Sequence, residues 1–101
     1  RLRTERVLYE EIIYVFRRGQ NVVFALTRGE VMERNALQRV MYKLKGREFV
    51  QIERGYIVNL NHIVRIKARE VYLTNGLSFR ASKERIDEVR ERMQEYWGGS
   101  R

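Results

Sequence analysis

Few of the residue types that enzymes use for catalysis occur in this sequence. It has one histidine (His62), one aspartate (Asp87) and no cysteine, so a histidine-dependent triad or a zinc site would have too few members. His62 lies between two strand-like segments, where a turn residue is the more ordinary interpretation. No glycine-rich loop leads into a helix to cradle a nucleotide phosphate, and the carboxylates Glu10, Glu11 and Glu53 pair with no obvious base. The sequence therefore predicts a protein that is not an enzyme and uses no cofactor or metal.

The chemistry that the side chains do offer is positive charge. The chain has 21 Lys and Arg residues against 13 Asp and Glu residues, a formal net charge of +8. Such an excess on a small surface favours polyanionic partners, chiefly nucleic acid and less often an anionic membrane. Residues 83–97 hold four basic and five acidic residues, so the excess lies upstream of them. The plain alternative is that the charge only keeps a basic protein soluble.

Length and composition bound the organisation of the chain. A sequence of 101 residues suffices for one compact domain, so residues 1–101 are expected to form a single domain. The lack of cysteine fits a reducing, cytoplasmic setting. No apolar run approaches the roughly 20 residues that span a bilayer, and no signal peptide is present. The first residue is Arg1 rather than methionine, which suggests that the chain was excised from a longer regulator.

Strand-like periodicity covers most of the chain. Clusters of β-branched and aromatic residues predict strands at residues 7–9, 12–16, 22–26, 31–34, 49–52, 56–59, 63–67, 71–74 and 77–81. The polar residues 17–21 read as a hairpin loop. Asn75-Gly76 predicts a second hairpin with a type I′ turn, in which both central residues need φ > 0.

The apolar period changes to 3.6 residues in only two places. The first predicted helix covers residues 35–45, with Asn35 as its N-cap and Gly46 closing it. The second covers residues 82–96, with Ser82 as its N-cap, an apolar face that includes Ile86 and Val89, and mixed charges on the solvated face. The pattern favours a structural role for this second helix.

The known DNA-binding motifs with a recognition helix do not fit this order. A helix-turn-helix needs two helices joined by a short turn, whereas a whole set of strands separates the two helices here. Zinc fingers lack ligands, and an RRM needs a βαββαβ order that the strand count exceeds.

The residues themselves resemble a known family. Residues 49–63, with the sequence FVQIERGYIVNLNHI, resemble the central signature of LytTR domains: a Phe, a basic-rich turn, an aromatic-aliphatic-Val-Asn run and an Ile. Residues 11–15, the helix around Leu37, and Asn75-Gly76 followed by residues 79–83 agree with the family in the same order. The resemblance covers about residues 7–89. It implies a mainly β fold of small antiparallel sheets packed together, elongated and β-sandwich-like, with one or two short helices.

The resemblance also implies a function and the segments that perform it. It points to sequence-specific binding of double-stranded DNA by the output domain of a bacterial transcription regulator, which reads the major groove through loops. Three segments would face the duplex: the hairpin with Arg17, Arg18 and Asn21, the turn around Arg54, and the junction with Lys83 and Arg85. Arginine suits guanine and asparagine suits adenine. Phosphate contact is the expected role at residues 82–85, where a helix begins.

The sequence departs from the family in the turn before Tyr56. The family turn resembles His-Arg-Ser, but here it is Glu53-Arg54-Gly55. Arg54 keeps the central position, whereas Gly55 removes a hydroxyl that could hold a phosphate. Glu53 either accepts from cytosine N4 or orients Arg54, and the second interpretation is favoured. Base preference is therefore expected to differ.

Two other classes of function remain open. One is a β-rich protein-interaction module that binds an acidic partner. The other is an RNA or single-strand binder that stacks bases on Tyr9, Tyr14, Tyr56 or Tyr72, although aromatic residues within strands are more often core. For the DNA-binding reading, the family implies paired DNA repeats, a homodimer on DNA and a missing N-terminal receiver or other sensory domain.

Overall fold

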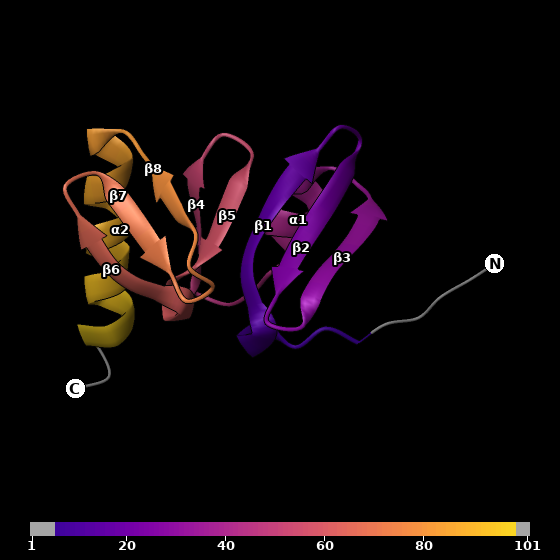
Figure 1. Cartoon of the computed structure of the whole chain (residues 1–101), viewed down its shortest axis with the longest axis horizontal. Helices are drawn as coiled ribbons and strands as arrows, with labels where there is room; N and C mark the ends of the chain where they lie inside the picture. The colour runs from indigo at the N-terminus through magenta and orange to yellow at the C-terminus, as the bar shows by residue number, and fades with distance from the viewer. Residues whose placement is uncertain (1–5, 99–101) are drawn as a thin grey trace.

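The computed structural model describes residues 6–98. The predicted domain limits at residues 1 and 101, and the argument drawn from Arg1, lie outside the described residues. The described part contains two antiparallel sheets, two α-helices and two short 3-10 helices, η1 (Tyr9–Glu11) and η2 (Leu60–His62) (Figure 1). The molecule measures 44 × 29 × 25 Å. The mainly β, elongated fold with packed antiparallel sheets is thus confirmed.

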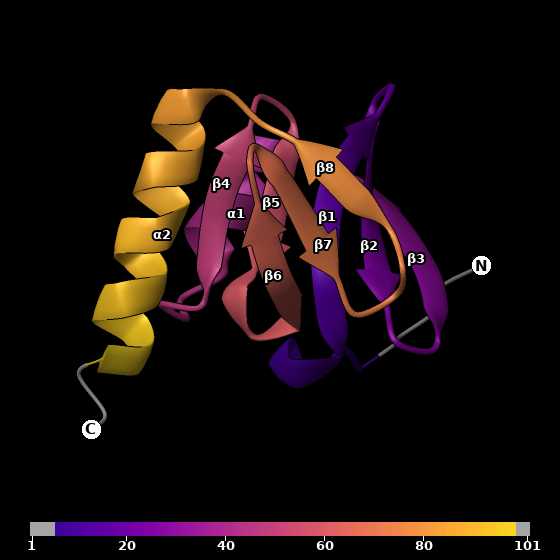
Figure 2. The ribbon, with the colours of Figure 1, turned by 60° about the vertical axis from the view of Figure 1, so that its left-hand side comes forward.

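The larger sheet has five strands in the order β3-β2-β1-β5-β4. Its strands are β1 (Ile12–Arg18), β2 (Asn21–Leu26), β3 (Gly29–Arg34), β4 (Phe49–Glu53) and β5 (Tyr56–Asn59). Helix α1 (Leu37–Lys43) connects β3 to β4. The smaller sheet has the order β6-β7-β8 and consists of β6 (Ile63–Lys67), β7 (Glu70–Leu73) and β8 (Ser78–Arg80). Helix α2 (Lys83–Gly98) follows it and lies beside the two sheets (Figures 1 and 2).

Two apolar clusters bury both faces of the larger sheet. One cluster joins this sheet to the smaller sheet and to α2, and includes Ile13, Val58, Val71, Ile86 and Val89. The other lies against α1 and is made by Ile12, Val15, Val22, Leu26, Leu37, Val40, Phe49 and Ile57. Because both faces are covered, β1 is a continuous apolar run rather than an alternating one. The two buried side chains of α2 contribute about 1.5–3 kcal/mol each, which agrees with the structural role predicted for this helix.

The first predicted helix is shorter than expected. It begins at Leu37, its N-cap position is Ala36, and no side chain caps it. Asn35 is therefore not the cap: its Oδ1 accepts from the N–H of Ala36 at 2.8 Å, and its Nδ2 donates to Glu33. Gly46 does not close the helix either, because the helix ends at Lys43, where the carbonyl accepts from the Tyr9 hydroxyl at 3.4 Å. The hydroxyl of Tyr9, a residue distant in sequence, thus satisfies a backbone carbonyl at the end of α1.

Two further local predictions were wrong. Residues 7–9 form no strand, since η1 starts at Tyr9 and the Leu8 N–H is taken by the Glu11 carboxylate at 2.8 Å. The second hairpin exists, but its turn is not type I′, because Gly76 has a positive φ (89°) and Asn75 does not. The Asn75 Oδ1 accepts from the Leu77 N–H instead. Together with the Leu73 N–H to Leu77 carbonyl bond, this gives a three-residue loop that ends in a left-handed glycine.

Candidate nucleic-acid interface

Three short segments lie along one edge of the molecule. They are the β1–β2 turn, the β4–β5 turn and the start of α2, and all three stand at the top in Figures 1 and 2. The N–H of Arg17 donates to the carbonyl of Gly55 at 3.2 Å, which fixes the first two segments against each other. We call this the turn-bearing edge. The structure therefore brings the three predicted segments to one side of the domain.

Glycines shape the two turns. Gly19 has φ 63° at the first central position of the β1–β2 turn, as a type II′ hairpin requires. Gly55 has φ 89° at the second central position of the β4–β5 turn, as a type II turn requires. Both turns hold only two residues between paired strand ends. The arginines beside them are therefore carried on well-defined backbone rather than on long loops.

The arginines of this edge differ in how they are engaged. Arg17 and Arg54 are exposed, and no carboxylate in residues 6–98 forms an ion pair with either. Arg18 is also exposed, but it lies 3.7 Å from the Glu30 carboxylate and over the Phe16 ring at 5.2 Å. Asn21 pairs with Arg18 in the hairpin register and is half-buried. The two unpaired guanidiniums leave their donors available to a ligand.

Arg17 and Arg54 also share a surface depression of about 560 Å³. Gln38 at the start of α1 and Gln51 on β4 line it with them. These two amides were not predicted as site residues. The signal that could have found Gln51 is its position between the buried Val50 and Ile52 in a strand, where only one face is open. The depression offers guanidinium and amide groups, which are the donor types that read base edges.

Lys83 and Arg85 are held by carboxylates of their own helix. Lys83 Nζ lies 3.0 Å from Asp87, and Arg85 Nη1 lies 3.2 Å from Glu88. These pairs are well exposed, so they contribute little and yield readily to a stronger anion. The Ser82 hydroxyl accepts from the Arg85 N–H at 3.3 Å, which confirms the predicted cap of this helix.

Glu53 does not orient Arg54 in this structure. Among the described residues, no hydrogen bond or ion pair joins the two side chains. The favoured interpretation of Glu53 is therefore not supported by the free domain.

An aromatic cluster supports the turn-bearing edge from within. Phe16 and Tyr56 are cross-strand partners with ring centroids 6.0 Å apart, and Phe79 of the smaller sheet packs 5.0 Å from Tyr14 and 4.9 Å from Tyr56. Burial, together with the nearby Glu30 carboxylate, raises the pKa of Tyr14. Because the cluster spans both sheets, it holds the two turns of the larger sheet in place relative to β8, the strand that leads to the start of α2.

The tyrosines considered for base stacking share no open surface. Tyr14 is 8% exposed, and Tyr56 is half-buried within the aromatic cluster. The Tyr9 ring meets Phe49 edge-on at 5.1 Å, and the Tyr72 ring is covered by the Arg65 guanidinium at 4.5 Å. A continuous stacking ridge of the kind that tracks single strands is not formed by these four rings.

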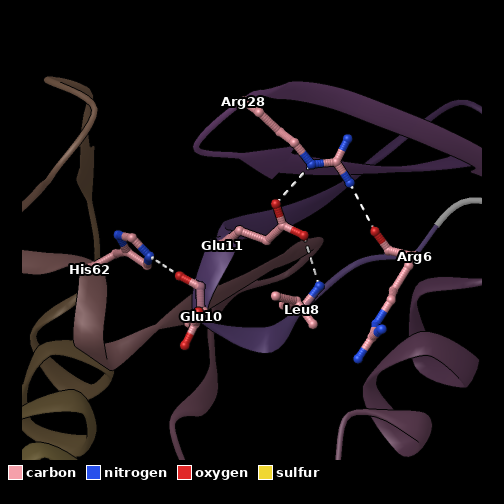
Figure 3. Close-up of polar contacts among 6 residues, drawn as sticks. All are labelled: Arg6, Leu8, Glu10, Glu11, Arg28 and His62. Carbon is pink, nitrogen blue, oxygen red and sulfur yellow. Dashed lines mark hydrogen bonds and ion pairs between the residues drawn. The ribbon is translucent and has the colours of Figure 1, made fainter.

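The residues that could have done acid–base chemistry have structural partners (Figure 3). His62 Nε2 bonds the Glu10 carbonyl at 2.8 Å. Its Nδ1 bonds the Thr74 hydroxyl at 2.7 Å, which ties η1 to the loop between β7 and β8. Glu11 accepts from Arg28 Nε and from the Leu8 N–H, each at 2.8 Å.

These contacts have electrostatic consequences at Glu11. The hydrogen bond from Arg28, aided by the Leu8 N–H, lowers the pKa of the Glu11 carboxyl.

His62 is a turn residue, as predicted. Within residues 6–98, no group of three or more His, Asp or Glu side chains is arranged to hold a metal ion, and no helix there is long and apolar enough to cross a membrane.

Comparison with known proteins bears on this arrangement. The family model described as the LytTr DNA-binding domain matches residues 3–94. A solved structure, the LytTr DNA-binding domain of a Bacillus cereus protein described as a methyl-accepting/DNA response regulator, superposes with a TM-score of 0.73 at 21% identity and covers 86% of this chain and 84% of its own. No curated protein sequence matches. The structural likeness is one of fold, and the family match extends over most of the chain.

Proposed function

The chain belongs to the LytTr DNA-binding domain family, and on this premise we propose that it binds double-stranded DNA sequence-specifically through the turn-bearing edge. The observation that carries the proposal is the convergence there of exposed cationic side chains from three separate segments, Arg17, Arg54 and Lys83. With a formal net charge of +8, the domain has the electrostatic character of a DNA binder.

The proposed contacts divide into two kinds. Arg54 and Arg17, with Asn21, would contact base edges in the major groove, since Arg suits guanine and Asn suits adenine. Lys83 and Arg85 would contact phosphate at the start of α2, where the first N–H groups of the helix also favour an anion. Arg18 would join the phosphate contacts once its exposed pair with Glu30 gives way.

The length and burial of the two helices support DNA reading by the turns rather than by a recognition helix. Helix α1 has seven residues and packs Leu37 and Val40 into the core. Helix α2 buries Ile86 and Val89 against the sheets, and only its first turn lies at the turn-bearing edge. The long axis of 44 Å corresponds to roughly 13 base pairs at about 3.4 Å each. A duplex laid along this axis would pass all three segments.

The wider setting belongs to the same proposal. We infer that the domain is the output part of a cytoplasmic bacterial transcription regulator, joined to an N-terminal receiver or other sensory domain. Binding to paired repeats as a homodimer follows from the same family reasoning. None of these features bears on the test below, which needs only the domain and DNA.

The test compares two substitutions on a duplex that the domain selects from a random pool. Arg54→Ala should weaken cognate binding by roughly 1–3 kcal/mol and change binding to random duplex much less. Lys83→Ala should weaken both alike and lower the slope of log K against log salt by about 0.9. Arg47→Ala, an exposed arginine beyond the end of α1, is the matched control and should change neither.

The outcomes separate the roles. Equal losses on all duplexes for Arg54→Ala would make Arg54 a phosphate clamp and would leave sequence reading to Arg17 and Asn21. An unchanged affinity would remove Arg54 from the interface. Failure of the unaltered domain to select any duplex, or a flat salt dependence, would refute the function itself and favour a protein partner.

A further inference from the structure

The smaller sheet has an outer face that the core does not use. Cross-strand partners share a face, and the register groups the outward residues into two rows. The rows are Arg65, Tyr72 and Ser78, and Lys67, Glu70 and Arg80. The partners on the opposite face, Ile66, Val71 and Phe79, pack into the core. Figure 2 shows this sheet in front of the other strands, with neither helix of the described chain covering it.

This outer face is strongly basic. Arg65, Lys67 and Arg80 are exposed on it, and Arg69 is exposed in the adjoining β6–β7 turn. The one carboxylate, Glu70, is half-buried and already engaged, at 3.8 Å from Arg80 and 3.3 Å from the Ser78 hydroxyl. Within residues 6–98 no carboxylate forms an ion pair with Arg65, Lys67 or Arg69. Four cations against one carboxylate leave the face about three charges positive.

The face is continuous with the turn-bearing edge. Ala81, which leads from β8 to the start of α2, donates its N–H to the carbonyl of Arg69 at 3.0 Å. The β6–β7 turn therefore packs against the junction that carries Lys83. Arg69 is thereby held next to the segment that begins α2.

We propose that this outer face binds the phosphate backbone of the same duplex, beyond the segment held by the turn-bearing edge. The inference rests on the proposed function and adds a second contact surface to it. Phosphate contact suits this face, because its exposed charged side chains are all cations and no Asn or Gln amide lies among them. The Tyr72 ring is covered by Arg65, so the face offers no free ring for stacking an unpaired base. Flanking DNA would then bend toward the smaller sheet.

The experiment measures how affinity depends on duplex length. The probe is a duplex selected from a random pool by the unaltered domain, trimmed to about 13 base pairs to match the long axis, and the same duplex with about 10 random base pairs added at each end. The test variant carries Arg65→Gln, Lys67→Gln and Arg69→Gln. The control carries Lys43→Gln, Lys45→Gln and Arg47→Gln, which removes the same charge. Lys45 also lies over a ring, that of Tyr42, at 4.4 Å.

This control surface lies on the side opposite the turn-bearing edge. The Tyr9 hydroxyl bonds the carbonyl of Lys43 and the N–H of Lys45, and η1, which carries Tyr9, stands at the bottom in Figure 1. The two variants have equal net charge, because each replaces three cations by Gln. They differ in the side of the domain from which the charge was removed.

The unaltered domain should bind the long duplex more tightly than the short one. The test variant should lose this advantage, and its salt slope on the long duplex should fall by about 2 to 3, one phosphate for each cation removed. Its affinity for the short duplex should change less than twofold. The control variant should keep the length advantage.

Three results would overturn the inference. The first is an equal loss of affinity for the long duplex in the test and control variants. The second is a loss of affinity in the test variant that is the same on the short and the long duplex. The third is that single-stranded DNA, added as a competitor, displaces the flanking part of the long duplex more readily than competitor duplex does. Failure of the unaltered domain to bind either duplex would overturn the proposed function as well. This outcome is recognised because the unaltered domain then shows no binding to the short duplex.

Discussion

Replacing the buried Asn59 by alanine should destabilise the fold strongly, although the residue lies far from the turn-bearing edge. Asn59 is 0% exposed at the end of β5. Its Nδ2 donates to the Ile12 carbonyl at 2.8 Å and to the Tyr9 carbonyl at 3.3 Å, while its Oδ1 accepts from the Asn61 N–H at 2.9 Å. One side chain thus joins η1, the start of β1 and η2.

The magnitude follows from how exposed each partner is. The bond to Ile12 is buried, and a buried acceptor left without its partner costs about 1–3 kcal/mol. The Asn61 N–H is only partly buried, so water replaces part of that bond and its loss costs about 1 kcal/mol. The total is roughly 2–4 kcal/mol of a stability that is of order 5–15 kcal/mol. At about 4–8 °C for each kcal/mol, Tm should fall by at least about 8 °C.

Urea unfolding followed by circular dichroism measures this loss, with Asn75→Ala as the matched control. Asn75 also accepts a backbone N–H through its Oδ1, that of Leu77 at 3.1 Å, but it is exposed. Its replacement should cost less than about 1 kcal/mol, because water takes over the bond. Similar losses for the two variants would refute the reasoning, since burial would then not decide the cost.

Two further predictions concern the Glu11 carboxylate and the β4–β5 turn. Because the pKa of Glu11 is lowered in the folded state, its stabilising contribution is present above the ordinary glutamate pKa of about 4.3 and is lost as pH falls through the lowered value. The difference in Tm between the unaltered domain and Glu11→Gln should therefore shrink on acidification, and a difference independent of pH would contradict it. Gly55→Ala should cost about 1–2 kcal/mol from backbone strain alone, since φ is 89° and an added Cβ would meet no atom within 4 Å. Thermal unfolding should rank Gly55→Asn nearer to the unaltered domain, and equal stability of all three would exclude strain.

Strand positions were predictable where local pattern decides them. Residues 56–59 and 63–67 form strands with the predicted limits, because clusters of β-branched and aromatic residues and the polar residues that flank them act over a few residues. The errors fall where a distant partner decides the conformation. Tyr9 leaves the strand pattern because its hydroxyl closes α1. Asn35 is an exception with a local cause, because its neighbours Glu33 and Ala36 take its amide.

The candidate site shows the same division. The basic turns around Arg17 and Arg54 could be found from residue types and from the family resemblance. Their junction through the Gly55 carbonyl could not be found, because it requires β1 to pair with β5 across some forty intervening residues. Gln38 and Gln51 were missed for the same reason, since they meet the arginines only once α1 and β4 are in place.

The central place of β1 has a consequence for how the chain reaches this structure. β1, β2 and β3 are consecutive and can form as a local meander, but the other side of β1 is filled by β5, which emerges after α1 and β4. Until then Tyr14, Val15 and Phe16 present an unpaired strand edge, a surface on which two nascent chains can pair with each other. Closing it depends on a non-local contact, which is the slow kind of step in β-rich domains. The rate at which β5 docks, rather than the final stability, therefore sets how long each new molecule remains prone to aggregation.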